Sequence, residues 1–162
     1  MSTSAFIGLG ANLADPGAQV LRALDELAHL PRCALLARSS LWRSAPVGYA
    51  DQPEFINAVV ELQTRLAPRV LLNYLLEIET RFGRDRSESE KWGPRELDLD
   101  LLTFGDESID EPGMHIPHPH LHERAFVLVP LAEIAPSLKI SGVGIVSELL
   151  ASVSVDGIEA IE

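Results

Sequence analysis

The order in which the apolar periodicity changes along the chain is the feature that most restricts its fold. Residues 4–9 form a short apolar run among glycines, which predicts a first strand. Asp15 followed by Pro16 is the pattern of a helix start, and apolar residues then recur at helical spacing as far as Pro31. Residues 34–42 return to a pattern typical of a strand, and we expect a second strand there.

Another strand and a second helix follow in the same way. Residues 43–53 contain two prolines and a glycine, which predicts a loop. Residues 55–64 alternate, so that Phe55 and Asn57 fall on one face of a strand and the larger set of apolar residues falls on the other. An apolar stripe at helical spacing then predicts a helix over residues 68–83.

The last strand of this series carries the most informative alternation. A polar loop over residues 84–95 precedes it, and residues 96–104 are predicted to be extended. Leucines at alternate positions face the core, whereas Asp98 and Asp100 face away from it. The order strand–helix–strand–strand–helix–strand is that of the ferredoxin-like α+β fold, in which helices cover one face of an antiparallel sheet. We therefore expect the functional site on the helix-free face, which also carries Asn57.

The last part of the chain is less regular. We expect a turn rich in proline and histidine over residues 116–122, short helices over 127–135 and 145–151, and a terminal hairpin around residues 156–157. No internal repeat or linker divides the sequence. Its length suits one compact domain over residues 1–162.

Charge and hydropathy argue against several classes of protein. The formal net charge of −11 disfavours a nucleic-acid partner, because binding to a duplex depends on neutralising its phosphates. No apolar stretch approaches the ~18 residues that a membrane span needs, and the first ten residues lack the pattern of a signal peptide. We therefore expect a cytoplasmic protein with neither a membrane nor an obligatory protein partner. The single cysteine, Cys33, allows no intrachain disulfide and is most simply interpreted as a buried thiol.

Asp98 and Asp100 are the strongest candidates for chemistry. Side chains two residues apart in a strand point the same way, about 6.6–6.8 Å apart along the chain. Two such carboxylates can converge on a pair of metal ions. Mg²⁺ suits them, because it takes a few carboxylates together with water and phosphate oxygens. The alternative is a solvated acidic strand face, which is less favoured because aspartate is depleted in strands.

Basic residues are concentrated beside the two aspartates. Five of the 13 lysines and arginines lie in one short segment, at Arg81, Arg84, Arg86, Lys91 and Arg95. Guanidinium groups match phosphate oxygens, so carboxylates beside arginines favour phosphoryl transfer. Taken alone, the cluster is explained equally well by a solvated loop whose acids balance its charge. We expect residues 87–92 to act as a lid, with Trp92 either capping a ligand or packing on the base of the loop.

Other motifs carry less weight. The turn at 116–122 and its approach contain four histidines at His115, His118, His120 and His122. Their spacing suggests zinc only weakly, because no cysteine lies near and prolines intervene; a histidine near phosphate, or a merely polar turn, is the preferred interpretation. The chain has no phosphate-binding P-loop, and Gly8-Leu9-Gly10 lacks the third glycine of a dinucleotide-binding fingerprint. Any ATP must therefore be held without a standard phosphate loop.

One segment resembles a known signature. Residues 92–101 read Trp-Gly-Pro-Arg-Glu-Leu-Asp-Leu-Asp-Leu, which is similar to the motif of the 6-hydroxymethyl-7,8-dihydropterin pyrophosphokinases, a family of folate biosynthesis. The resemblance continues in order along nearly the whole chain, at residues 8–13, 52–58, 116–118 and 124–126. It implies a ferredoxin-like enzyme that transfers the terminal diphosphate of ATP to the hydroxymethyl oxygen of the pterin and leaves AMP.

The resemblance also implies roles for individual residues. Asp98 and Asp100 would hold two Mg²⁺ ions, and Arg84 and Arg95 would be the catalytic residues that bind the transferred phosphates. The residues expected around ATP are Arg84, Arg86, Arg95, Leu101, His118 and Arg124. Those expected around the pterin are Ser44, Val47, Phe55, Asn57, Trp92 and Phe126, of which the two phenylalanines would stack on the two faces of the ring.

Two other functions share parts of this pattern. A two-metal phosphohydrolase would use the same carboxylates and arginines, but it would release phosphate or diphosphate without needing a pterin. A non-catalytic ferredoxin-like binding module would consume no ATP and would leave the pairing of Asp98 with Asp100 unexplained. Analysis of the products separates all three.

Overall fold

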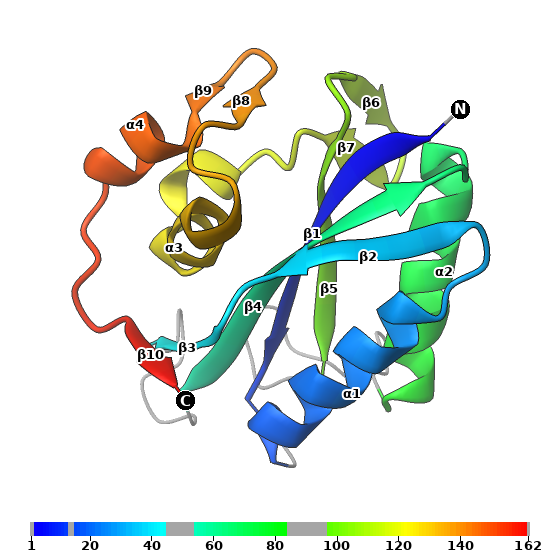
Figure 1. Ribbon diagram of the computed structural model, residues 1–162, viewed down its shortest axis with the longest axis horizontal. Helices are drawn as coiled ribbons and strands as arrows, with labels where there is room; N and C mark the ends of the chain where they lie inside the picture. Colours follow the sequence, from blue (N-terminus) through cyan, green and yellow to red (C-terminus); the bar gives the residue numbers. More distant parts are fainter. Residues whose placement is uncertain (1, 13–14, 45–53, 84–96, 162) are drawn as a thin grey trace.

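The computed structural model describes residues 2–12, 15–44, 54–83 and 97–161 of the chain, and its centre is a twisted antiparallel sheet (Figure 1). Within these residues the strands lie in the order β10-β3-β4-β1-β5, with β2 also paired to β4. The strands of this sheet are β1 (Thr3–Ala11), β2 (Cys33–Arg38), β3 (Leu41–Ser44), β4 (Phe55–Thr64), β5 (Asp98–Phe104) and β10 (Glu159–Ile161). The order β4–β1–β5, with β2 and β3 beyond β4, is the arrangement expected for the ferredoxin-like α+β fold.

Helices α1 (Pro16–Ala28) and α2 (Pro68–Arg81) cover one face of the sheet. Both begin with proline in the first turn, as predicted. The carboxylate of Asp15 accepts a hydrogen bond from the backbone N of Ala18 at 3.4 Å, so it caps the first turn of α1. Gly83 follows α2 with φ 93°, a conformation that favours glycine after a helix end.

The main hydrophobic core lies between these two helices and the sheet. Alternate residues of the central strands point into it, including Ile7, Leu9, Val60, Leu62 and Leu99. The helices contribute residues at the predicted spacing, namely Val20, Leu24, Leu27, Leu71, Leu75 and Ile78. All are buried, so the alternation in the strands and the stripes on the helices are both confirmed.

The opposite face is not helix-free, which corrects one expectation from the sequence. Helices α3 (Ala125–Ile134) and α4 (Val146–Ala151) pack on part of it and enclose a second, smaller core (Figure 1). Its members from the main sheet are Phe6, Val59 and Leu102. The sequence predicted both helices within two residues of their ends, but it did not show which face they would cover.

The predicted strand over residues 34–42 is two strands, and the predicted loop over 43–53 begins too early. The chain breaks between β2 and β3 at Ser39, whose Oγ accepts a hydrogen bond from Val59 N at 2.9 Å and so replaces a backbone partner. Because residues 34–42 contain neither glycine nor proline, the break gives no sequence signal. Ser44, which we had placed in the loop, is the last residue of β3.

The C-terminal hairpin predicted around residues 156–157 is also wrong. Strand β10 instead pairs with β3, with Glu159 opposite Arg43, and adds an outer strand to the main sheet. Local turn chemistry at Gly157 (φ 80°) was read correctly, but the partner strand is distant in sequence. The described residues also contain the short hairpins β6–β7 (Ile109–Glu111, Met114–Ile116) and β8–β9 (Lys139–Ile140, Gly144–Ile145), and a 3₁₀ turn at Leu121–Glu123.

Candidate active site

A cavity of about 830 Å³ opens beside β5 and gathers most of the residues that the sequence singled out. Its lining includes Ser44, Phe55, Asn57, Asp98, Asp100, Leu101, His118, Arg124 and Phe126. The other candidates are Val47, Arg84, Arg86, Trp92 and Arg95, and they lie outside the described residues, as does the predicted lid over 87–92. Every residue that the resemblance assigned to metal, ATP or pterin and that the structure describes therefore borders the same cavity; Arg81 and His122 do not line it.

Strand register forms the floor of this cavity. Gly10 of β1 pairs with Asn57 on one side and with Asp98 on the other, so these three residues form one row across the sheet. A side-chain carbon at Gly10 would lie only 3.1 Å from Asn57 Oδ1. Glycine at this position therefore keeps the space between the amide and the carboxylate open, which is a close-approach role rather than a turn.

The next row across the sheet has the same design. Gly8 of β1 pairs with Val59 and with Asp100. The face begins to become apolar in this row, because Val59 belongs to the second core. The two glycines thus mark the part of the face that α3 and α4 leave uncovered, and both aspartates lie at its border.

Asn57 is held by a buried hydrogen bond. Its Nδ2 donates to Ser44 Oγ at 2.6 Å, and both side chains are about 95% buried. Phe55 precedes Asn57 on the same strand face and lines the cavity, and Phe126 lines it from the first turn of α3. This end of the cavity combines two aromatic rings with a fixed amide, a combination suited to a flat polar ring.

Asp98 and Asp100 project from β5 on the same face and are both half-buried. Arg124 Nη1 lies 4.0 Å from Asp100 Oδ2, and the guanidinium carbon of Arg124 lies 5.6 Å from the centre of the Phe126 ring. Within the described residues, no three His, Cys, Asp or Glu side chains are grouped to hold a metal ion. Two half-buried carboxylates on one strand face suit Mg²⁺, which takes a few carboxylates together with water and phosphate oxygens.

His118 is neutral in this environment. Burial, together with the nearby Arg124 and His120, lowers its pKa from 6.5 to about 4, although Asp98 acts in the opposite direction. Its Nδ1 accepts a hydrogen bond from His120 N at 3.1 Å, so the ring proton belongs on Nε2. His118 N also donates to Leu102 O at 2.9 Å, which fixes the residue against β5. A neutral ring held in this way offers one N–H donor to a ligand.

The cavity continues around β5, which is the outer strand of the sheet formed by the described residues. Leu99 and Leu101 point to the side of α2, opposite to the two aspartates. On that side the lining comes from α2 and from the β6–β7 hairpin, at Leu72, Leu76, Glu79, Gly113, Met114, His115 and Ile116. We call this part the edge arm, and the part over the glycines and aspartates the sheet arm.

Sequence reasoning missed most of the edge arm. Glu79 is the clearest case: it is 2% exposed, and its Oε2 accepts a hydrogen bond from Leu99 N at 2.7 Å. An acid four residues after Leu75, on an otherwise apolar helix stripe, was the available signal. The β6–β7 residues gave none, because strands of three residues carry too little alternation to be recognised.

The fold is ferredoxin-like α+β, and its cavity brings together two carboxylates, an arginine and a neutral histidine. Residues 6–136 match the family described as 7,8-dihydro-6-hydroxymethylpterin-pyrophosphokinase. The chain therefore belongs to this family.

Similar proteins agree with this assignment. The 2-amino-4-hydroxy-6-hydroxymethyldihydropteridine pyrophosphokinase of Pseudomonas aeruginosa is 47% identical over 154 residues, which cover 95% of this chain and 94% of the relative. The protein of the same name from Methylorubrum extorquens is 43% identical, with 99% of each chain covered. A crystal structure of a Plasmodium falciparum HPPK-DHPS triple mutant with pteroate is similar in fold, with a TM-score of 0.72 and 14% identity. The match covers 93% of this chain and 43% of that longer one.

Proposed function

We propose that the two arms of the cavity divide the substrates of this enzyme between them, the pterin in the sheet arm and the base of ATP in the edge arm. The protein is an ATP-dependent diphosphotransferase. It transfers diphosphate from ATP to the hydroxymethyl group of 6-hydroxymethyl-7,8-dihydropterin, giving AMP and the pterin diphosphate in a step of folate biosynthesis. Reaction between the substrates requires their reactive groups to meet at β5, which lies between the arms.

The sheet arm suits the pterin for three reasons. Phe55 and Phe126 offer two aromatic surfaces for a flat ring, and edge-on or stacked aromatic contacts favour such a ring. Asn57, oriented by Ser44, offers an amide that can pair with the ring's own donors and acceptors. A ring bound there lies on the row that contains Asp98, so its hydroxymethyl group can reach the aspartates. We propose that Val47 and Trp92 also contact the pterin.

The edge arm suits the base of the nucleotide. Leu72, Leu76 and Met114 supply apolar surface on which a flat base can pack. Leu101, which we predicted to contact ATP, lies on this side of β5. The triphosphate then extends from the edge arm past β5 toward the sheet arm.

Asp98 and Asp100 are proposed to hold two Mg²⁺ ions at that crossing. Bound Mg²⁺ would supply positive charge that neutralises phosphate oxygens and lowers the cost of charge development in the transition state. Arg124, 4.0 Å from Asp100, can bind a phosphate oxygen, and the N–H of neutral His118 can donate to another. We propose that Arg84, Arg86 and Arg95 also bind the phosphates, with Arg84 and Arg95 acting on the transferred group.

The chemistry assigned to these residues is an in-line displacement. The hydroxymethyl oxygen of the pterin attacks the β-phosphorus of ATP, a new P–O bond forms, and the bond between that phosphorus and the oxygen bridging to the α-phosphate breaks. AMP leaves with the electron pair, and the hydroxyl proton passes to water. The side chains need only position and neutralise charge, because phosphoryl transfer requires little covalent chemistry from the protein.

One observation carries this proposal: the register that places Asn57, Gly10 and Asp98 in one row, with Asp100 in the next. The test is incubation of the protein with ATP, Mg²⁺ and the hydroxymethyldihydropterin, with AMP and the pterin diphosphate quantified by chromatography. Equal amounts of both products, formed only when pterin is present, are expected. Phosphate or diphosphate released without pterin would indicate a phosphohydrolase, and no ATP consumption would indicate a binding module.

The place of action is a separate question. Among the described residues, no helix is long and apolar enough to cross a membrane. We propose that the enzyme acts in the cytoplasm, on ATP and a small pterin and without an obligatory protein partner.

A further inference from the structure

The β6–β7 hairpin is a small structure that needs support from elsewhere. It pairs Ile109 with Ile116, and Glu111 with Met114, and it forms its own two-stranded sheet apart from the main one. An isolated two-stranded hairpin is marginally stable in water. Met114 and Ile116 anchor strand β7, because both are buried in the main core. The tip, at Pro112 and Gly113, is exposed, as are Asp110 and Glu111 of β6.

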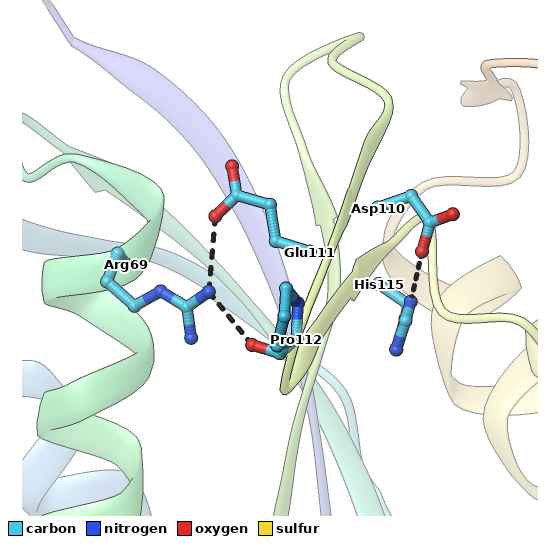
Figure 2. A network of polar contacts seen from close by, with 5 residues as sticks. All are labelled: Arg69, Asp110, Glu111, Pro112 and His115. Carbon is cyan, nitrogen blue, oxygen red and sulfur yellow. Dashed lines mark hydrogen bonds and ion pairs between the residues drawn. The ribbon is translucent and has the colours of Figure 1, made fainter.

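Arg69 of α2 holds this tip (Figure 2). Its Nη2 donates to Glu111 Oε1 at 3.1 Å and to the backbone oxygen of Pro112 at 3.0 Å. A side-chain carbon on Gly113 would lie 3.7 Å from Nη1, so the guanidinium rests directly against the turn. The same view shows Asp110 and His115 paired across the two strands, with Asp110 Oδ1 and His115 Nδ1 2.7 Å apart. The hairpin is thus tied both within itself and to α2.

The two elements that Arg69 joins are the two walls of the edge arm. Residues 72, 76 and 79 of α2 line this arm, and they recur at the helical spacing that places them on the same side of α2 as Arg69. The opposite wall is formed by Gly113 to Ile116 of the hairpin. Arg69 therefore bridges the walls at one end of the arm.

The bridge contributes little to global stability. The side chains of Arg69 and Glu111 are 42% and 56% exposed, and exposed ion pairs typically stabilise a protein by only ~0–1 kcal/mol. Its second hydrogen bond, to a backbone carbonyl in the turn, instead fixes where the hairpin sits relative to α2. A small energy is enough for this, because the tip residues Pro112 and Gly113 are exposed.

We propose that Arg69 is a positioning residue for ATP: by tying the β6–β7 tip to the first turn of α2, it holds the walls of the edge arm at the separation that the base of ATP requires. This inference rests on the proposed placement of the base in the edge arm. Arg69 does not line the cavity itself, so it acts through the hairpin.

The test compares ATP with inorganic triphosphate. Both are titrated calorimetrically in the presence of Mg²⁺ and without pterin, against wild type and Arg69→Ala. Triphosphate carries the phosphates but no base. We expect Arg69→Ala to weaken ATP binding roughly 5- to 20-fold while triphosphate binding changes by less than about twofold. In turnover assays, KM for ATP should rise, whereas KM for the pterin and kcat at saturating ATP should not change.

Matched variants separate positioning from a general effect of charge. Glu111→Gln removes the ion pair but leaves the bond to Pro112, so it should weaken ATP binding less than Arg69→Ala. The ATP affinity of Arg69→Lys should fall between those of wild type and Arg69→Ala. A lysine ammonium keeps the positive charge but cannot reproduce the planar guanidinium contacts to Glu111 and Pro112. The control is Glu26→Gln, which removes the carboxylate from the 2.7 Å ion pair between Glu26 of α1 and Arg81 at the end of α2; it should leave ATP binding unchanged.

Two results would overturn the inference. One is unchanged ATP affinity in Arg69→Ala, and the other is an equal loss for ATP and triphosphate. These titrations do not depend on transfer, so wild-type protein that makes no AMP in the presence of pterin would count against the proposed function alone.

Discussion

The two faces of the central sheet are built from the same strands but have different contents. On the side of α1 and α2, alternate residues such as Ile7, Val60 and Leu101 are buried without interruption. On the other side, the apolar residues Val59 and Leu102 are buried under α3 and α4 only along part of the strands. Farther along, that face changes to glycine, asparagine and aspartate, and the cavity begins there.

The change occurs on three neighbouring strands within one row of each other, since Val59 is still level with Gly8 and Asp100. Strand β1 passes from Phe6 to its two glycines, β4 from Val59 to Asn57, and β5 from Leu102 to Asp100. One face therefore stabilises the fold over its whole length, whereas the other divides its length between packing and chemistry. Loss of a side chain should affect stability on the first face and catalysis on the polar part of the second.

The largest effect is expected at the aspartates. Asp98→Ala and Asp100→Ala should each lower kcat by about a thousandfold or more, because each removes a metal ligand from the reacting phosphates. The melting temperature should stay the same or rise, since like charges in neighbouring positions repel. Steady-state kinetics and thermal melts check both parts. Turnover close to that of wild type in both variants would contradict the metal assignment.

A substitution on the opposite face should show the reverse behaviour. Leu75 is fully buried in the main core, and Leu75→Ala should lower the free energy of unfolding by about 2–5 kcal/mol. The kcat per folded molecule should remain near that of wild type. Urea unfolding followed by activity measurements in native buffer tests this. A large loss of kcat with unchanged stability would contradict the claim that this face contributes to stability and not to catalysis.

The aromatic pair should give an intermediate effect that is specific to one substrate. Phe55→Ala and Phe126→Ala should each weaken pterin binding roughly 10- to 50-fold, because each removes a stacking surface and buried apolar area. ATP affinity should change much less, since the edge arm is on the other side of β5. Fluorescence or calorimetric titration with each substrate separates the two. Equal losses for both substrates would argue against a separate sheet arm for the pterin.

The smallest effect concerns pH and His118. Its pKa is about 4 in the folded protein and 6.5 when unperturbed, so between these values the unfolded chain binds more protons. Stability should therefore rise with pH across this window and level off above it. His118→Gln should show a weaker rise than wild type. Urea unfolding at about pH 5 and about pH 7.5 measures the difference; identical pH dependence in both proteins would mean that His118 titrates normally.

Much of the fold was predictable, because long strands and helices carry many periods. Residues 55–64 and 68–81 were assigned within two residues of their ends. The break at Ser39 was not, since a serine hydroxyl replaces the backbone partner of Val59 without any glycine or proline to mark it. The pairing of β10 with β3 was missed for a related reason: a strand of three residues does not specify its distant partner.

The site residues also differ in how far the sequence could predict them. Alternation alone placed Asp98, Asp100 and Asn57 on one face, because side-chain direction in a strand alternates regularly. The row through Gly10 required the register between strands, which is set by the whole sheet. The edge arm could not be predicted from strand register either, because Glu79 and the β6–β7 residues meet only after α2 and the hairpin pack together.

The central claim is that the polar part of the second face, at Asp98 and Asp100, is where metal and triphosphate bind. The most direct measurement is a titration with Mn²⁺ followed by electron paramagnetic resonance, in the presence of a non-hydrolysable ATP analogue. Wild-type protein should bind two Mn²⁺ ions per chain, and Asp98→Asn and Asp100→Asn should each bind fewer, with unchanged melting temperatures. The same number of bound ions in wild type and both variants would contradict the claim.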